Sequence, residues 1–287
     1  MTTEGSLLIV ATPVGNLGDL TPRAARAIEE ADAVACEDTR RTAKLLAGTS
    51  LKARRLVSFH AHNERGRIPE LIGLMQSGAT VALVSDAGTP TVSDPGSRLV
   101  EASVAAGIAV SAIPGASAVL LALVLSGFDT ARFCFEGFLP RRGVQRRRRL
   151  AEIASETRTT VVFESPVRLG ATLEELGGVC GPTRRVAVAR ELTKLHEEVW
   201  RGDLAGSAQW AGEGRVRGEC TIVIEGRPSV PRTVSDEEVA AALQRRAAHD
   251  SPGTTRDVVD AVACELGIAR RRVYDVQLQG RSRSAID

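Results

Sequence analysis

Lys194 and its neighbours have the composition of an acid–base site. The lysine lies in the segment ARELTKLHEE (189–198), and the chain has only three lysines, Lys44, Lys52 and Lys194, among 37 basic residues. A lysine can act as a general base when burial lowers its pKa, although neighbouring glutamates oppose that shift. Glu191 could orient the lysine or take a proton itself. A polar cluster at the surface is the ordinary alternative for both residues.

Two further segments carry candidate bases. His60 and His62 alternate in SFHAHNE (58–64), so both rings would face one side of an extended segment. A neutral imidazole is a competent base near neutral pH. Glu164 lies in VVFESPVRL (161–169), directly after an apolar run. Each of these residues could instead be a polar group at the edge of the core.

Three turn-rich segments follow apolar runs and could hold a ligand. They are PVGNLGDLT (13–21), SDAGTPTVSDPG (85–96) and IPGASA (113–118). Open α/β sheets bind ligands at the carboxyl ends of their strands, and glycines let the backbone approach a ligand closely. The first segment has glycines at GxxG spacing, but the chain has neither a GxGxxG sequence nor a P-loop.

The segment 85–96 is longer than a simple turn requires. Two aspartates, two glycines and two prolines follow the apolar run 81–84. Asp86 or Asp94 could face a cationic sulfonium or amine, or accept a hydrogen bond from a ribose hydroxyl. The alternative is a pair of ordinary turns, because Asp94-Pro95-Gly96 is a common turn tripeptide.

Alternating strand and helix patterns over the first 115 residues must position these loops. Strands are predicted at 7–11, 33–36, 56–59, 81–84 and 109–113. Helices are predicted at 22–32, capped by Thr21, at 41–46, around Leu71 to Met75, and at 99–105. Strands that alternate with helices imply a mostly parallel sheet covered on both faces, which is an α/β fold.

A second unit is predicted from Pro114 onward. A helix begins at Ser117, and strands at 133–135 and 160–163 flank a helix at 145–155, with another helix after Pro166. Three more strands, at 186–189, 197–201 and 220–224, have short connections. This pattern indicates a partly antiparallel α/β domain.

The last part of the chain is predicted to be helical only. Residues 226–234 contain two prolines and are typical of a linker. A capping box of Ser235 and Glu238, a helix from Thr254 ended by Gly267, and a helix at 273–278 follow. We therefore expect an N-terminal α/β domain (1–114), a C-terminal α/β domain (115–228) and a small helical domain (229–287).

The composition excludes several classes of protein. Hydrophobic residues make up 43%, charged residues 25%, and the net charge is +2, as in an ordinary globular protein. No apolar run reaches the roughly 18 residues that cross a bilayer, and no signal peptide is recognisable, so we expect a cytoplasmic protein. The five cysteines are widely spaced with no CxxC pair, so neither disulfides nor a metal site is expected.

The loop sequences PVGNLGD, VALVSDAGTP and IPGASA resemble those of the tetrapyrrole (corrin/porphyrin) methylases. Further segments are similar to one branch of that family, the bacterial small-subunit (16S) ribosomal RNA 2′-O-ribose methyltransferases of type I. They are CEDTRRT (36–42), SFHAHNE, FEGFLPRR (135–142), VVFESPVRL and ARELTKLHEE. The resemblance covers residues from about 6 to 226 in order.

This resemblance implies two α/β domains with S-adenosylmethionine between them, and methylation of a cytidine ribose in 16S ribosomal RNA by a homodimer. It places these residues on the family's cofactor contacts: Pro13, Ser85, Asp86, Ala87, Gly88, Ser117 and Ala118. Phe163 stands where the family often has tyrosine. The strand ECTIVIEG (219–226) also differs in detail, which leaves open whether Cys220 lies beside the adenine.

Methyl transfer to a ribose hydroxyl would be helped by one general base. The hydroxyl must lie roughly 3 Å from the methyl group and in line with the sulfur, and a base that takes its proton accelerates the step. Lys194, His60, Glu191 and Glu164 are the candidates for that base. No metal is required.

Two acid-free basic stretches, between Thr39 and Asn63 and between Glu136 and Glu152, suit a phosphate backbone. The predicted RNA contacts are Arg40, Arg41, Arg141, Arg142, Arg146, Arg147, Arg148 and Arg149. A solvated helix face is the ordinary alternative. If these arginines contact RNA, affinity for small ribosomal subunits falls steeply with salt.

Two other functions remain open from the sequence. A methyltransferase of a small tetrapyrrole would share the cofactor loops, but it needs neither the arginine run nor the helical tail. A non-catalytic ribosome-assembly factor would use the basic stretches, but it needs no specialised loop at 85–96.

Overall fold

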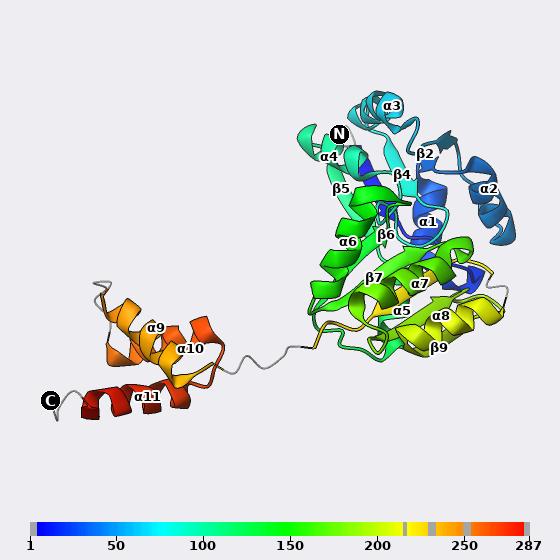
Figure 1. Ribbon diagram of the computed structural model, residues 1–287. Helices are drawn as coiled ribbons and strands as arrows, with labels where there is room; N and C mark the ends of the chain where they lie inside the picture. The colour runs from blue at the N-terminus through cyan, green and yellow to red at the C-terminus, as the bar shows by residue number, and fades with distance from the viewer. Residues whose placement is uncertain (1–4, 215–216, 229–233, 249–253, 284–287) are drawn as a thin grey trace. The chain divides into compact units, whose positions relative to one another are not determined.

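The computed structural model describes residues 5–214, 217–228, 234–248 and 254–283 (Figure 1). The chain divides into two compact units, residues 1–228 and 229–287, which we call the α/β unit and the helical unit. Each is described by itself. Among the described residues no helix is long and apolar enough to cross a membrane, and all five cysteines are free thiols.

The first half of the α/β unit is a five-stranded sheet in which every neighbouring pair is parallel. Its strands are β1 (Ser6–Val10), β2 (Ala33–Cys36), β3 (Leu56–Ser58), β4 (Thr80–Val84) and β5 (Ala109–Ile113), in the order β3-β2-β4-β1-β5. The connecting helices are α1 (Pro22–Glu30), α2 (Thr39–Gly48), α3 (Glu64–Gln76) and α4 (Ser97–Ala105). Separate apolar clusters cover its two faces, which confirms the predicted parallel α/β architecture.

Local caps explain where two of these helices begin. The Thr21 hydroxyl accepts a hydrogen bond from the Ala24 amide and Pro22 takes the first helical position, as the sequence predicts. Asp38 caps α2 by accepting from the amides of Arg40 and Arg41. That helix therefore begins at Thr39, earlier than the predicted 41.

The second half of the α/β unit is a mixed sheet. Its strands are β6 (Phe133–Phe138), β7 (Thr159–Glu164), β8 (Arg185–Arg190), β9 (Glu198–Asp203) and β10 (Cys220–Ile224), in the order β6-β7-β10-β8-β9. Only β6 and β7 run parallel; the other neighbouring pairs are antiparallel. One face packs on α5 (Ala118–Ser126). The other packs on α6 (Gly143–Ser155), α7 (Pro166–Cys180) and α8 (Leu204–Glu213), the last of which the sequence analysis did not predict.

The helical unit contains α9 (Asp236–Ala248), α10 (Thr255–Leu266) and α11 (Arg270–Arg283) around a core of valines, alanine and leucine. The predicted capping box is present: the Ser235 hydroxyl accepts from the Glu238 amide, and the Glu238 carboxylate accepts from the Ser235 amide. Gly267 ends α10 in the left-handed conformation, at φ 63°. Of the predicted linker 226–234, residues 229–233 lie outside the described residues.

Candidate active site

The three predicted ligand loops meet at one edge of the first sheet. They follow β1, β4 and β5, which are adjacent and parallel, so their carboxyl ends lie together. Thr12 and Gly88 exchange two backbone hydrogen bonds, of 2.9 and 3.1 Å, which join the first loop to the second. The Thr89 hydroxyl donates to the Ala116 carbonyl, which joins the second to the third. The predicted convergence of the loops is confirmed.

A cleft of about 370 Å³ lies between these loops and the ends of β7 and β10 in the second sheet. This size is within the usual range of small-molecule sites. Of the predicted cofactor residues, five line it: Asp86, Ala87, Gly88, Ser117 and Ala118.

Pro13 and Ser85 support the cleft from beneath. Both are buried, and neither lines the cleft; Val14 lines it in place of Pro13. The Ser85 hydroxyl donates to the carbonyls of Ala87 and Gly88, at 3.3 and 3.2 Å, and so holds the loop in its turn. Ser85 therefore acts on the shape of the loop 85–96.

The loop 85–96 has an unusual backbone. Gly88 has φ 78°, and two residues with side chains, Thr91 (φ 72°) and Ser93 (φ 67°), are also left-handed. Such conformations cost of the order of 1 kcal/mol or more for residues with a Cβ and cluster at functional sites. The loop carries this strain at the position where Asp94 lines the cleft.

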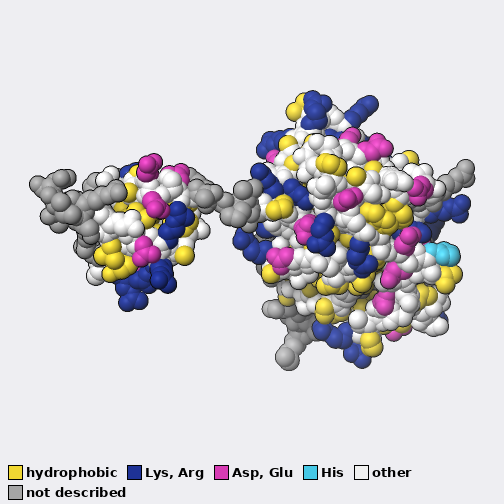
Figure 2. Space-filling view, turned by 60° about the horizontal axis from the view of Figure 1, so that its bottom comes forward, with side chains coloured by type: hydrophobic (Ala, Val, Ile, Leu, Met, Phe, Trp, Pro, Cys, Tyr) yellow, Lys and Arg dark blue, Asp and Glu magenta, His cyan; other side chains and the backbone are white. Residues whose placement is uncertain are grey.

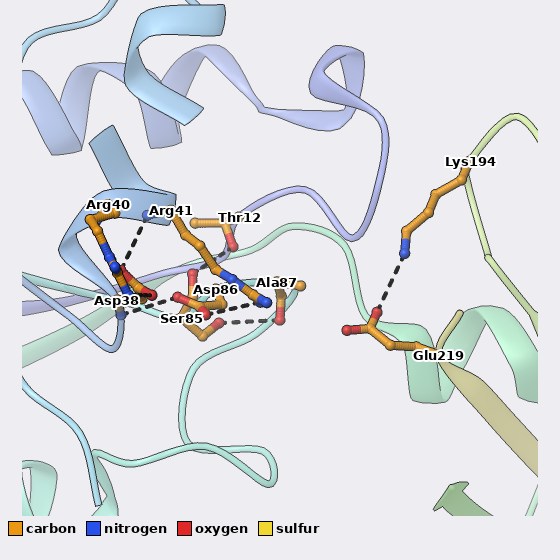
Figure 3. A network of polar contacts seen from close by, with 9 residues as sticks. All are labelled: Thr12, Asp38, Arg40, Arg41, Ser85, Asp86, Ala87, Lys194 and Glu219. Atoms are coloured by element: carbon orange, nitrogen blue, oxygen red, sulfur yellow. Dashed lines mark hydrogen bonds and ion pairs between the residues drawn. The ribbon is translucent and has the colours of Figure 1, made fainter. Parts of the chain in front are cut away.

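Five carboxylates line the cleft: Glu37, Asp86, Asp94, Glu164 and Glu219. Asp86 is partly neutralised, since it accepts from the Asp38 amide at 3.2 Å and pairs with Arg41 at 3.2 Å (Figure 3). Burial, followed by the charge of Asp86, raises the pKa of Glu37. The site therefore favours a cationic ligand or bound protons.

Asp94 is the carboxyl most changed by this environment. Burial and then the charge of Glu37 raise its pKa to about 6, although a hydrogen bond from Ser85 acts in the opposite direction. A carboxyl with a pKa near neutrality can both take and release a proton at physiological pH. From the sequence alone Asp94 is predicted only as a possible polar contact to a ligand.

Lys194 lies across the cleft region from the Arg41–Asp86 pair (Figure 3). Its Nζ is 2.9 Å from Glu191 Oε1 and 3.7 Å from Glu219 Oε2. Burial lowers its pKa, but the hydrogen bond with Glu191 and the charge of Glu219 outweigh burial, so the pKa is raised. The pKa decrease that a base would need is absent.

The backbone around Lys194 is shaped to hold its side chain. A Cβ on Gly15 would lie 2.3 Å from the Lys194 Cγ, and a Cβ on Gly218 would lie 1.8 Å from the Glu191 Oε1. Glu191 (φ 50°) and Thr193 (φ 65°) are left-handed. Two glycines and a strained turn therefore fix the Lys194–Glu191 pair in place.

Glu164 lines the cleft, but its contacts are structural. Its side chain is fully buried; Oε1 accepts from the Ser165 amide at 2.7 Å and from Arg168 at 2.6 Å, and Oε2 accepts from the Thr172 hydroxyl at 2.8 Å. Both oxygens are already hydrogen-bonded. These contacts anchor the end of β7 to α7, and the role of Glu164 as a base stays a prediction.

His60 lines a second, more open hollow of about 640 Å³. This hollow shares Glu37, Arg41 and Asp86 with the cleft. The His60 and His62 rings lie 6.0 Å apart, as their spacing predicts, although they lie in a turn instead of an extended segment. His60 Nδ1 is buried with no hydrogen-bond partner among the described residues. His60 therefore stands beside the cleft and does not line it.

The predicted RNA-binding arginines have different surroundings. Arg40 is 91% exposed, and Arg41 enters the cleft. In the second stretch Glu136 and Glu152 pair with Arg149, and Glu152 also pairs with Arg148. The remaining exposed arginines, Arg141, Arg142 and Arg147, have no ion pair within the described parts of the chain.

Arg146 does not belong to this surface, which corrects the prediction. Its residue is 7% exposed. The guanidinium donates to Glu175, to the Pro140 carbonyl and to the Thr172 hydroxyl. It therefore joins α6 to α7. Figure 2 shows basic, acidic and apolar side chains interspersed over the α/β unit on the face in view.

Aromatic and sulfur groups complete the wall formed by the second sheet. Phe138, Phe163 and Cys220 line the cleft, and burial raises the pKa of the Cys220 thiol to about 11. Phe138 was missed from the sequence, as were Glu37 and Glu219. Within the described ranges no cluster of three or more His, Cys, Asp and Glu residues could hold a metal ion.

Residues 6–207 match the family described as Tetrapyrrole (Corrin/Porphyrin) Methylases. The chain is 45% identical over 284 residues to the ribosomal RNA small subunit methyltransferase I of Mycobacterium bovis, covering 97% of this chain and 96% of the relative. It is 45% identical over 223 residues to the protein of the same name from Thermotoga maritima, covering 78% of this chain and 99% of the relative. Because the match covers 99% of that relative, the relative lacks a further segment as long as the helical unit.

Solved structures share the fold at lower identity. The uroporphyrin-III C-methyl transferase from Thermus thermophilus, complexed with S-adenyl homocysteine, is 19% identical. It superposes with a TM-score of 0.55, covering 77% of this chain and 97% of that protein. The match concerns the α/β architecture.

Proposed function

The chain belongs to the tetrapyrrole methylase family, in the group named ribosomal RNA small subunit methyltransferase I, and we propose that it methylates a cytidine ribose at the 2′-oxygen in 16S ribosomal RNA. The observation that carries the proposal is the joined set of three loops at adjacent strand ends, facing an acidic cleft. The names of relatives at 45% identity supply the substrate class.

The residues of the cleft fit S-adenosylmethionine. When bound, this cofactor supplies a methyl group on a cationic sulfur. Asp86 and Glu37 favour a cation, and the first amides of α5, after its cap Ser117, favour an anionic group such as a carboxylate. Gly88 leaves room for close backbone approach. Ser85 keeps the second loop in shape, and Pro13 precedes Val14, which lines the cleft.

We assign the proton transfer to Asp94. The hydroxyl proton of the ribose passes to the ionised Asp94 carboxylate as the oxygen–methyl bond forms and the sulfur–methyl bond breaks. A pKa of about 6 leaves most of this carboxyl ionised at neutral pH. His60, outside the cleft lining, and Glu191, held by Lys194, are the weaker candidates.

Lys194 acts as a cation in this proposal. With its pKa raised it keeps its proton at neutral pH, and it faces Glu219 at the cleft. An ammonium in this position suits a phosphate of the RNA backbone. Arg41 supplies a second cation on the opposite side.

RNA docking would use the exposed arginines Arg40, Arg141, Arg142 and Arg147, with Arg148 and Arg149 exchanging Glu152 for phosphate. Counterion release makes such binding fall steeply with salt. Affinity for small subunits measured between about 50 and 200 mM salt tests this surface. A flat response would contradict it.

The assembly is proposed as a cytoplasmic homodimer with two α/β domains, 1–114 and 115–228, in each chain. Leu120 and Val124 on α5 are 53% and 63% exposed. They lie one turn apart on the same helix face, and β5 beside them in sequence is an edge strand. Light scattering of the Leu120→Glu and Val124→Glu variants tests the dimer, which either charge should weaken.

The activity is tested by mixing the full chain with labelled S-adenosylmethionine and small ribosomal subunits. We expect label in the RNA, at a 2′-O-methylated cytidine identified by mapping. A parallel reaction with uroporphyrinogen tests transfer to a tetrapyrrole, and label there alone would overturn the proposal. Absence of cofactor binding by calorimetry would favour a non-catalytic assembly factor.

A further inference from the structure

The strand β6 contains an irregularity that determines the direction of Phe138. Residues 133–135 pair in register with 159–161, but Phe138 pairs with Phe163, so β6 has one extra residue in between. Gly137, at φ 63°, takes up the bulge. The bulge brings Phe138 onto the sheet face that carries Phe135 and Phe163.

The three phenylalanines form an aromatic cluster at the cleft. The Phe135 and Phe163 rings lie 4.9 Å apart edge to face, and Phe138 lies 5.6 Å from Phe163. The whole chain has only six phenylalanines, two tryptophans and one tyrosine. A third of its aromatic side chains are thus gathered in this one place.

Phe138 is the member of the cluster that remains open to a ligand. It lines the cleft and is 56% exposed, whereas Phe135 and Phe163 are partly buried and pack on the core. A Cβ on Gly137 would lie 3.1 Å from the Ser93 hydroxyl. The residues before Phe138 and before Asp94 therefore pass close to each other, and the ring and the carboxyl line the same cleft.

We propose that Phe138 is a stacking platform for the base of the target nucleotide, held unstacked from its RNA neighbours at the mouth of the cleft. This inference rests on the proposed function. Enzymes that modify a base take its nucleotide out of the stack, and the same movement would bring a ribose into this cleft, where the released base needs a new π surface. Aromatic rings supply that surface for any base.

The position of Phe138 distinguishes the RNA base from the adenine of the cofactor. The cofactor loops are on the first sheet, and the enclosed wall of the second sheet is formed by Phe163, Cys220 and Thr221. Phe138 is the exposed ring at that wall. Because Phe138 and Asp94 line the same cleft, a base stacked on the ring would bring its own ribose toward Asp94.

The test uses the full chain with Phe138→Leu, Phe138→Trp and, as a matched control for loss of an exposed apolar group outside the cleft, Val104→Ala. We measure kcat and KM for methyl transfer to small ribosomal subunits, and the Kd of S-adenosylmethionine by calorimetry. Base–aromatic stacking predicts that Phe138→Leu lowers kcat/KM by about 10- to 100-fold and leaves the cofactor Kd unchanged. Phe138→Trp retains the activity, and Val104→Ala behaves as the wild type.

Three outcomes would overturn the inference. A parallel loss of cofactor affinity in Phe138→Leu would assign the ring to the adenine. Unchanged kcat/KM in that variant, with an active wild type, would leave the ring without a role in the reaction. A wild type that transfers no methyl group to small subunits would remove the proposed function and the RNA base with it. An unchanged thermal midpoint of Phe138→Leu excludes unfolding as the cause of a loss.

Discussion

Two turns of the α/β unit, one from each sheet, present a titratable group beside the same cleft. The loop 85–96 has left-handed Thr91 and Ser93 and carries Asp94; the turn 191–197 has left-handed Glu191 and Thr193 and carries Lys194. The pKa of each titratable group is raised. The two turns are alike in backbone strain and in the direction of the shift.

The chemical consequences of the two shifts are opposite. Asp94 is buried among like charges, so its pKa rises toward neutrality and the carboxyl can exchange protons. Lys194 is surrounded by opposite charges, which outweigh its burial, so its pKa moves further from neutrality. In both cases a strained turn positions the titratable side chain. The charges of residues on other segments then determine whether that side chain can act as a base.

The largest expected effect is the loss of the base in Asp94→Asn. The amide cannot take the hydroxyl proton, so kcat should fall by about 10²- to 10³-fold while the cofactor Kd is retained. Single-turnover transfer from labelled cofactor to small subunits measures the chemical step. In the wild type the same rate should rise with pH through about 6, because the base must be ionised.

A matched control comes from an exposed carboxylate outside the cleft. Asp32→Asn removes a carboxylate outside the cleft that pairs with Arg54, and should leave kcat unchanged. If Asp94→Asn kept the wild-type rate, Asp94 would not be the base, and the proposed chemical difference between the two turns would be wrong.

The second prediction distinguishes two roles of Lys194, that of a cation and that of a general base. If the ammonium acts only as a cation, Lys194→Arg should keep most of the activity, and Lys194→Met should lose about 10-fold, mainly in KM for RNA. A lysine base would be abolished by both changes, because arginine does not give up its proton. Equal, complete loss in the two variants would return the base to Lys194.

The sheet and its loops could be predicted because their signals are local. The run from Leu7 to Ala11 and the cap at Thr21 depend on a few consecutive residues, and both appear within one or two positions in the structure. The helix α8 was missed because it begins at Leu204, directly after β9 ends at Asp203, with no turn residues to separate them.

The site could be predicted only in part, because its electrostatics come from distant residues. Asp94 looks like an ordinary turn residue until Glu37 and Glu219 are brought beside it by the fold. Arg146 looks like its neighbours in the arginine run until the helix phase turns it toward Thr172. Sequence position alone does not supply either fact.

A smaller effect of Asp94→Asn is expected on the free energy of unfolding. The variant should be more stable than the wild type although it is less active. In the folded protein Asp94 has a pKa of about 6, against 3.8 without burial, so between these values the folded state binds more protons and its stability falls as pH rises. Asp94→Asn removes this penalty and should stabilise the protein by about 1–2 kcal/mol at pH 8, allowing for partial solvent access.

The measurement is urea unfolding of wild type and Asp94→Asn at about pH 8 and pH 4. At pH 4 the folded carboxyl is protonated and resembles the amide, so the difference should shrink. A variant less stable than the wild type at both pH values would mean that the charged form of Asp94 stabilises the fold, against the assignment of its raised pKa.

The smallest effect tests Glu219, whose charge acts on the titratable groups of both turns. Glu219 is 72% exposed, and its charge raises the pKa of both Asp94 and Lys194. In Glu219→Gln the pKa of Asp94 should fall, so the rising limb of kcat against pH moves to lower pH. Because solvent and salt screen an exposed charge, the shift should be below about one pH unit and should shrink at high salt. A limb that does not move at low salt would show that the base is not beside Glu219, and would contradict its assignment to Asp94.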